Sequence, residues 1–158
     1  MKEFREELEE AKRASVAQLL FRCARLWNEQ AILRVRRVTG MKGFRQAHTT
    51  LFPHISLEGT RLTEIAARLD VSKQAVAPLV DEMVAMGALE KIPDPDDGRA
   101  RLIRFTEQGQ GEMMQGLGVL LQLQEEMTNR LGEERMANFH ETLLLLQDEL
   151  ERRPLEEE

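Results

Sequence analysis

Few side chains in this 158-residue sequence could act as nucleophiles or metal ligands. The single cysteine, Cys23, cannot form an intramolecular disulfide. The three histidines have no cysteine or carboxylate at the spacing of a metal site; they are His48, His54 and His140. No nucleophile paired with a base, phosphate-binding loop or paired-carboxylate motif can be read. The sequence therefore argues against an enzyme, and we expect neither a metal nor another cofactor.

A second group of side chains suits hydrogen bonding to the edges of DNA bases. Ser72, Lys73 and Gln74 stand at the start of a helical pattern. Glutamine can bond an adenine edge in two places, and lysine can reach a guanine or a phosphate. Ala75 suits contact with a thymine methyl, and Ala77 shares the outer face. The alternative is a solvated helix start whose first residue is only a cap.

Two short helices must position these residues. The pattern of residues 62–69 predicts one helix, and Ser72 is a favourable cap for a second. In the second helix the inward face is apolar and Gly87 ends the pattern; the inward residues are Val76, Leu79, Val80 and Met83. This leaves the outer, N-terminal part to Ser72, Lys73, Gln74 and Ala77. Two short helices joined by a turn of three or four residues form a helix-turn-helix.

A hairpin follows directly. Residues 89–92 and 101–105 read as short strands, and residues 93–98 between them are rich in turn formers, including Asp97-Gly98. A hairpin after a helix-turn-helix predicts the wing of a winged helix.

Longer helices are expected on both sides. Residues 4–38 lack proline and glycine and repeat apolar residues at spacings of three and four, which predicts one long helix whose stripe partly meets a second chain. A short helix over 41–52 should end at Pro53. Helices are also predicted from Thr106 to Leu131, despite four glycines, and over 133–152.

Composition and charge bound the function. A hydrophobic content of 42% is enough for the core of one domain, and no apolar run is long enough for a membrane span, so we expect a cytoplasmic protein. The net charge of −6 opposes binding to nucleic acid. However, residues 133–158 carry nine acids against three bases, whereas residues 30–57 hold five bases and no acid. Either the basic segment contributes to binding or it is simply a solvated face.

The order of these elements and the string DPDDGRARLIRFTEQG resemble the multiple-antibiotic-resistance-regulator (MarR) family of bacterial winged-helix repressors. The resemblance covers nearly the whole chain, including LTEIAARLDVSKQAV as the helix-turn-helix. It implies a mainly α fold with a small β-hairpin wing, in a single domain over 1–158. Residues 54–106 would be the DNA-binding part, and residues 1–40 and 107–153 the dimerisation helices. A homodimer would then place two recognition helices in successive major grooves of a pseudo-palindromic site in double-stranded DNA.

The resemblance also assigns roles in the wing. Arg99 matches the arginine that enters the minor groove, where a narrow, negative channel attracts guanidinium, and Asp97 is placed to orient it. Gly98 replaces a further arginine that is often present. Arg101 would contact phosphate or instead pair with Asp94 or Asp96.

A small aromatic or anionic effector that relieves repression is the remaining implication. Residues that would line its crevice, or simply pack, are Trp27, His48, Phe52 and His54. A branch of the family senses peroxide with a cysteine activated by tyrosines. Because this chain has no tyrosine, we expect Cys23 to face the core.

Pro78 departs from the family pattern. A proline inside a helix removes one backbone hydrogen bond, so it would either kink the recognition helix or weaken its binding to DNA. Pro78, Gly98 and the acidic balance together favour one rival function, a winged-helix interaction module that has lost DNA binding.

Overall fold

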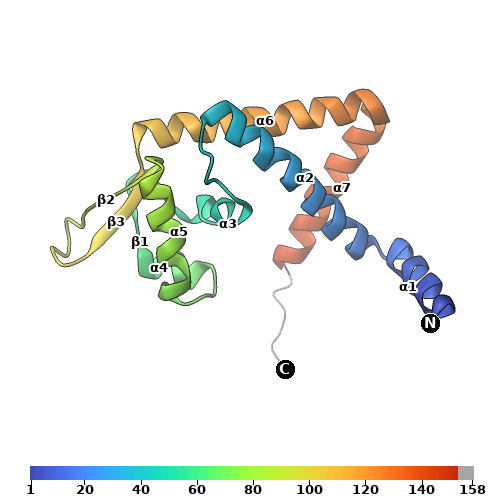
Figure 1. Ribbon diagram of the computed structural model, residues 1–158, viewed down its shortest axis with the longest axis horizontal. Helices are drawn as coiled ribbons and strands as arrows, with labels where there is room; N and C mark the ends of the chain where they lie inside the picture. The colour runs from blue at the N-terminus through green and yellow to red at the C-terminus, as the bar shows by residue number, and fades with distance from the viewer. Residues whose placement is uncertain (153–158) are drawn as a thin grey trace. The chain divides into compact units, whose positions relative to one another are not determined.

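The computed structural model describes residues 1–152, so the last six residues of the predicted domain 1–158 lie outside it. The described chain is mostly helical with one small sheet, which confirms the predicted fold class (Figure 1). Contacts divide the chain into two compact units, the first over Met1–Leu117 and the second beginning at Gly118. No helix of the described residues is long and apolar enough to cross a membrane.

Two helices, rather than the single helix predicted over 4–38, form the N-terminal part. Helix α1 spans Lys2–Ala14 and α2 spans Val16–Thr39. Ser15 between them has an extended backbone, and its side chain accepts a hydrogen bond from the N–H of Gln18 at 3.3 Å. The hydroxyl caps a new helix, so the single-helix prediction is wrong at this residue. Gly40, with φ 76°, ends α2 at Thr39, one residue beyond the predicted range.

The helix predicted over 41–52 is also wrong in extent. Helix α3 covers only Gln46–Thr49, and a 3-10 turn, η1, covers Phe52–His54. Met41 and Phe44 are buried although they lie outside any helix. Their apolar side chains therefore anchor a loop against the core, and this loop was mistaken for the first turn of a helix.

The winged-helix part follows the predicted order. Strand β1 (Thr60–Arg61) precedes α4 (Leu62–Arg68) and α5 (Lys73–Ala85), and the hairpin of β2 (Leu89–Pro93) and β3 (Arg101–Phe105) comes next. The three strands form an antiparallel sheet in the order β1-β3-β2. Strand β1 was not predicted, because two residues are too few to show an alternating pattern.

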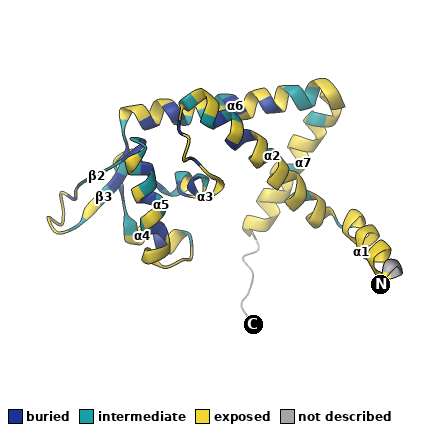
Figure 2. Ribbon diagram, viewed as in Figure 1, coloured by how far each residue is buried: buried dark blue, intermediate teal, exposed yellow. Residues whose placement is uncertain are grey.

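The core of the first unit lies where α3, α4, α5 and the sheet meet (Figure 2). Apolar side chains from α4, α5, the sheet and the segment that follows α3 are excluded from solvent; the most buried are Leu51, Ile65, Val76, Val80, Met83, Leu89 and Ile103. Burial of such side chains contributes about 1.5–3 kcal/mol each relative to exposure. This packing supports α5 from its inner face and leaves its outer face free.

Helices α6 (Glu107–Leu131) and α7 (Glu133–Arg152) complete the chain. The four glycines predicted to weaken the first half of α6 do not interrupt it. At its start, the Thr106 hydroxyl donates to the carbonyl of Gly87 at 2.6 Å and accepts from the N–H of Gly109 at 2.9 Å. Helix α7 has no buried residue, and Leu144, Leu145, Leu146 and Leu150 are exposed.

Candidate nucleic-acid interface

The N-terminal turn of α5 is exposed to solvent and begins at a capping residue. The Ser72 side chain accepts a hydrogen bond from the N–H of Ala75 at 3.2 Å, so Ser72 is the predicted cap. Lys73, Gln74 and Ala75 are exposed, whereas Ala77 is half-buried and is the least available of the predicted contacts. An exposed polar turn on a buried, packed helix can enter a groove without disturbing the core.

Pro78 lies within α5 and is exposed, and the helix continues through it to Ala85. Because proline has no N–H, the carbonyl of Gln74 receives no helical hydrogen bond from position 78. This carbonyl belongs to one of the predicted base-contacting residues. The proline thus loosens the backbone at the middle of the exposed face without ending the helix.

The base of the wing is fixed by a buried carboxylate. Asp94 accepts from Arg61 Nε at 2.5 Å and from the N–H of Asp96 at 2.9 Å. The Arg61 guanidinium is the main cause that lowers the pKa of Asp94. The ion pair suggested between Arg101 and Asp94 or Asp96 does not form, because Asp94 is occupied by Arg61. Within residues 1–152 Arg101 is exposed and makes no ion pair.

At the tip of the wing, Asp97 orders the backbone rather than a guanidinium. Its Oδ1 accepts from the N–H of Arg99 at 3.0 Å, and its carbonyl accepts from the N–H of Ala100 at 2.8 Å. Arg99 is exposed, and nothing lies within 4 Å of a Cβ placed on Gly98. The tip is therefore a narrow, ordered turn that presents an arginine to solvent.

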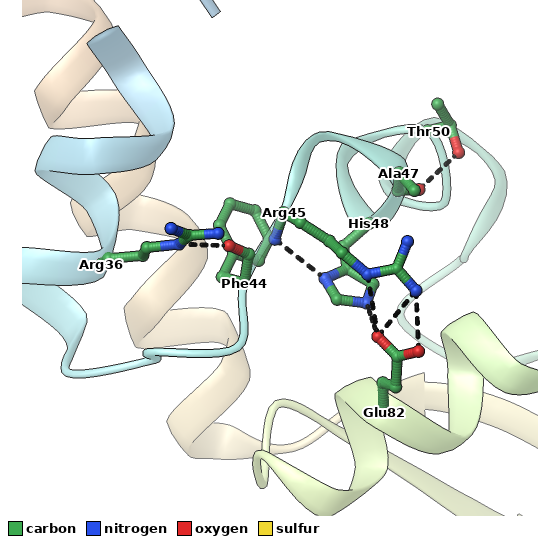
Figure 3. A network of polar contacts seen from close by, with 7 residues as sticks. All are labelled: Arg36, Phe44, Arg45, Ala47, His48, Thr50 and Glu82. Atoms are coloured by element: carbon green, nitrogen blue, oxygen red, sulfur yellow. Dashed lines mark hydrogen bonds and ion pairs between the residues drawn. The ribbon is translucent and has the colours of Figure 1, made fainter. Parts of the chain in front are cut away.

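Behind α5 lies a polar network that the sequence analysis missed (Figure 3). The Arg45 guanidinium donates to both oxygens of Glu82, from Nη2 to Oε1 at 2.7 Å and from Nε to Oε2 at 3.1 Å. His48 Nε2 lies 2.9 Å from Oε2 of the same carboxylate. The N–H of Arg45 donates to His48 Nδ1 at 3.1 Å. Since Nδ1 accepts, the hydrogen of the neutral ring is on Nε2, which donates to Glu82.

The surroundings favour a neutral histidine beside a charged glutamate. Burial is the main cause that lowers the pKa of His48, which is fully buried. Hydrogen bonding from Arg45 is the main cause that lowers the pKa of Glu82. The acid-free composition of residues 30–57 was the available signal, because Arg45 and His48 must find an acidic partner outside that segment. Sequence spacing does not reveal that the partner is Glu82 of α5.

The residues predicted to line an effector crevice have different surroundings. Trp27, Phe52 and His54 are half-buried, whereas His48 is fully buried and both its ring nitrogens are hydrogen-bonded. Phe52 stacks on Phe44 with ring centroids 5.9 Å apart. Phe52 and His48 therefore serve packing and hydrogen bonding in this state.

Cys23 is exposed, so the prediction that it faces the core is wrong for the single chain. It lies on α2, more than two turns before the buried residues Ala31, Ile32 and Val35. Among the described residues, no group of three or more His, Cys, Asp or Glu could hold a metal ion.

Comparison with known proteins supports the predicted winged helix. Residues 48–100 match the sequence model of the MarR family. The transcriptional regulator Tm0710 of Thermotoga maritima is 27% identical, with a TM-score of 0.58 over 85% of this chain and 96% of that one. No curated protein sequence matches the chain. The family match and the structural likenesses confirm the predicted resemblance.

Two further solved structures share the fold at lower identity. The reduced form of MarR from E. coli is 20% identical, with a TM-score of 0.70 over 84% of this chain and 96% of that one. The transcriptional repressor CouR bound to a 23-mer DNA duplex is 18% identical, with a TM-score of 0.63 over 89% and 95%. CouR from Rhodococcus jostii RHA1 has also been solved bound to p-coumaroyl-CoA, at 19% identity and a TM-score of 0.61 over 84% and 91%.

Proposed function

We propose that this chain is a regulator of the MarR type, that is, a homodimeric, sequence-specific DNA-binding transcription regulator that represses until an effector binds. The observation that carries the proposal is the pairing of an exposed, capped start of α5 with an ordered wing that presents Arg99. Both elements stand on the same packed core, because α5 contacts β2. A helix in the major groove and an arginine in the adjacent minor groove is the binding mode that this arrangement favours.

The exposed apolar residues support a homodimer. Helices α1 and α2 expose Phe4, Leu19 and Leu26, and α7 exposes Phe139 and further leucines. Apolar stripes of this length on a soluble chain usually mark a protein interface. A second copy of the same helices would cover them, and two-fold symmetry would present two α5 helices to a pseudo-palindromic site.

The structural neighbours support DNA and a small-molecule effector as the binding partners. CouR is a repressor that binds a DNA duplex and, in another structure, p-coumaroyl-CoA, which is both aromatic and anionic. By the same logic, we propose that a small aromatic or anionic molecule relieves binding here. Trp27 and His54, both half-buried, remain the candidates for contact with it.

A salt-titrated mobility-shift assay on random-sequence and genomic DNA tests the proposal. DNA binding driven by lysine and arginine must weaken steeply as salt rises, since each phosphate contact releases counterions. A genomic fragment should retain binding at salt concentrations that remove binding to random DNA. If neither DNA binds at low salt while the protein remains folded, the interaction module without DNA binding is the correct function.

A further inference from the structure

His48 is the one described histidine with no solvent exposure, and the proposed contacts to DNA do not use it. Both of its ring nitrogens are committed, Nδ1 to the main chain of Arg45 and Nε2 to the carboxylate of Glu82. Glu82 belongs to α5, the helix proposed to read DNA, and lies on the turn that follows Pro78. A buried side chain thus connects the recognition helix to the segment that follows α2.

A series of hydrogen bonds extends this connection to α2. Arg36, in the last turn of α2, donates from Nε to the carbonyl of Phe44 at 2.5 Å (Figure 3). The next residue, Arg45, gives its N–H to His48 and its guanidinium to Glu82. Each step joins neighbouring groups of the first unit. A displacement of residues 44–48 would therefore change the hydrogen bonds that hold the Glu82 carboxylate.

We propose that His48 is a positioning residue for DNA binding, which holds α5 in its reading position through Glu82 and does so only as a neutral imidazole. The inference rests on the proposed function, because it concerns the helix that would read DNA. The geometry requires the neutral ring, since Nδ1 must accept the N–H of Arg45. With a proton on Nδ1, the ring N–H and the N–H of Arg45 would both be donors facing each other. The hydrogen bond between them, which holds the start of α3, would then be lost.

The charged groups around His48 determine when it gains a proton. Glu82, from α5, favours the cation, while burial and the Arg45 guanidinium oppose it, and burial is the largest of these effects. Arg36, from α2, is engaged with the Phe44 carbonyl. The pKa of His48 in the folded protein therefore lies below its ordinary value of 6.5. Neutral His48 stabilises the fold fully above pH 6.5, and this contribution is lost as pH falls from 6.5 to the folded-state pKa.

The sign of the pH effect on DNA binding separates this role from general electrostatics. Protonation of exposed histidines adds positive charge and tightens binding to phosphates as pH falls. Protonation of His48 releases α5 and weakens binding. Below the folded-state pKa of His48, affinity should fall by about tenfold per pH unit for each protomer that must lose a proton to bind.

The test measures DNA affinity from pH 8 to 5 at constant salt for the full chain and two complementary variants. His48→Gln places an amide N–H toward Glu82 and cannot titrate, so it should retain most of the affinity at pH 7.5 and lose the fall at low pH. His48→Asn places a carbonyl toward the N–H of Arg45 but does not reach Glu82, so its affinity should be reduced at every pH. His140→Gln, at an exposed histidine of α7, is the matched control and should keep the wild-type fall.

Glu82→Gln offers a second route if the His48 variants do not fold. It removes the charge that Arg45 binds while leaving an oxygen for Nε2, so affinity at pH 7.5 should drop and the fall at low pH should persist. Overlap of the wild-type and His48→Gln profiles would overturn the inference. So would a wild-type affinity that rises steadily on acidification.

An NMR titration of the His48 ring separates failure of this inference from failure of the proposed function. If the wild-type protein binds no DNA at any pH, the proposed function fails. The ring signal then decides the inference on its own: a titration midpoint below 6.5, accompanied by changes in the Arg45 amide, supports a neutral connection between α3 and α5. A midpoint at or above 6.5 in the folded protein overturns it.

Discussion

Gly109 lies directly against the main chain of Ala88, so close that a Cβ atom at position 109 would be 1.9 Å from the Ala88 carbonyl oxygen. The same α6 helix carries Gly111, around which nothing lies within 4 Å of an added Cβ. Two glycines in one helix, two residues apart, therefore have opposite reasons for being glycine. The first is required by packing, and the second only weakens the helix.

Replacing these two glycines by alanine should change stability in opposite directions. Gly109→Ala forces a methyl group into backbone and should lower the free energy of unfolding by about 3 kcal/mol or more. Gly111→Ala should raise it by up to ~1 kcal/mol through helix propensity. Urea unfolding followed by circular dichroism measures both. Equal effects of the two substitutions would contradict the packing described at Ala88.

Arg99→Ala should weaken DNA binding without unfolding the protein. Substitution of an exposed side chain usually changes the free energy of unfolding by less than ~0.5 kcal/mol. Loss of one ionic contact should flatten the plot of log affinity against log salt by roughly 0.9, or nearly twice that for a dimer. Lys91→Ala is the matched control, because Lys91 pairs with Asp81 and should change the slope less. Wild-type affinity and slope in Arg99→Ala would remove the wing from the interface.

Substitutions of Pro78 should separate the effect of the missing backbone hydrogen bond from the effect of a missing phosphate contact. Pro78→Ala restores an N–H that can bond the Gln74 carbonyl, and it should stabilise the protein by as much as ~3 kcal/mol. Pro78→Arg adds a phosphate contact and should also tighten DNA binding beyond the alanine variant. Thermal unfolding and affinity measured on both proteins give the two effects. Weaker binding in both variants would mean that the reading geometry requires the proline.

Acid should destabilise the wing through Asp94. Arg61 holds the pKa of Asp94 below its ordinary value of 3.8. The unfolded chain therefore takes up this proton first, and the stabilisation is present above pH 3.8 and is lost as pH falls from there to the folded-state pKa. Asp94→Asn should be less stable than wild type at pH 7 and lose less stability on acidification. Asp96→Asn, at an exposed neighbour, is the control and should leave the acid profile unchanged.

Removal of residues 1–14 should disrupt the dimer. The cut removes α1 and leaves the Ser15 cap of α2 in place, so α2 itself should still form. We expect monomers or aggregates, because the cut removes Phe4 and Leu8 from the proposed interface and leaves the exposed apolar residues of α2 and α7 without those partners. Analytical ultracentrifugation measures the state directly. A truncated chain that stays a soluble dimer of unchanged stability would place the dimer interface elsewhere.

Features set by neighbouring residues were predicted well from the sequence. The Ser72 cap, the end of α5 near Gly87 and the hairpin at Asp97-Gly98 each depend on residues within a few positions. Ser15 shows the limit, because its hydroxyl starts a helix inside a pattern that otherwise continues without interruption. Propensity alone does not distinguish a serine that caps from one that lies within a helix.

The pairing of distant charges could not be predicted in the same way. Asp94 was one of two alternative partners suggested for Arg101 and instead binds Arg61, and Arg45 binds Glu82 of α5. In both cases the partner is more than thirty positions away. Only the folded backbone brings such groups together, so the sequence gives their charge but not their neighbours. Ser72, Lys73, Gln74 and Ala75 are exposed as expected, whereas Ala77 is half-buried.

The Thr106 hydroxyl joins the end of the wing to its beginning, because it bonds the Gly87 carbonyl and the N–H of Gly109 together. A second closure, from the N–H of Asp94 to the carbonyl of Ala100, shuts the tip. Residues 95–99, beyond the second closure, lie outside the strand pairing, so their number can change without altering the register of the sheet. Doubling a flexible loop costs only ~0.6 kcal/mol. The wing can therefore gain or lose residues over evolution, or accept an inserted reporter peptide, while the helices on either side keep their register.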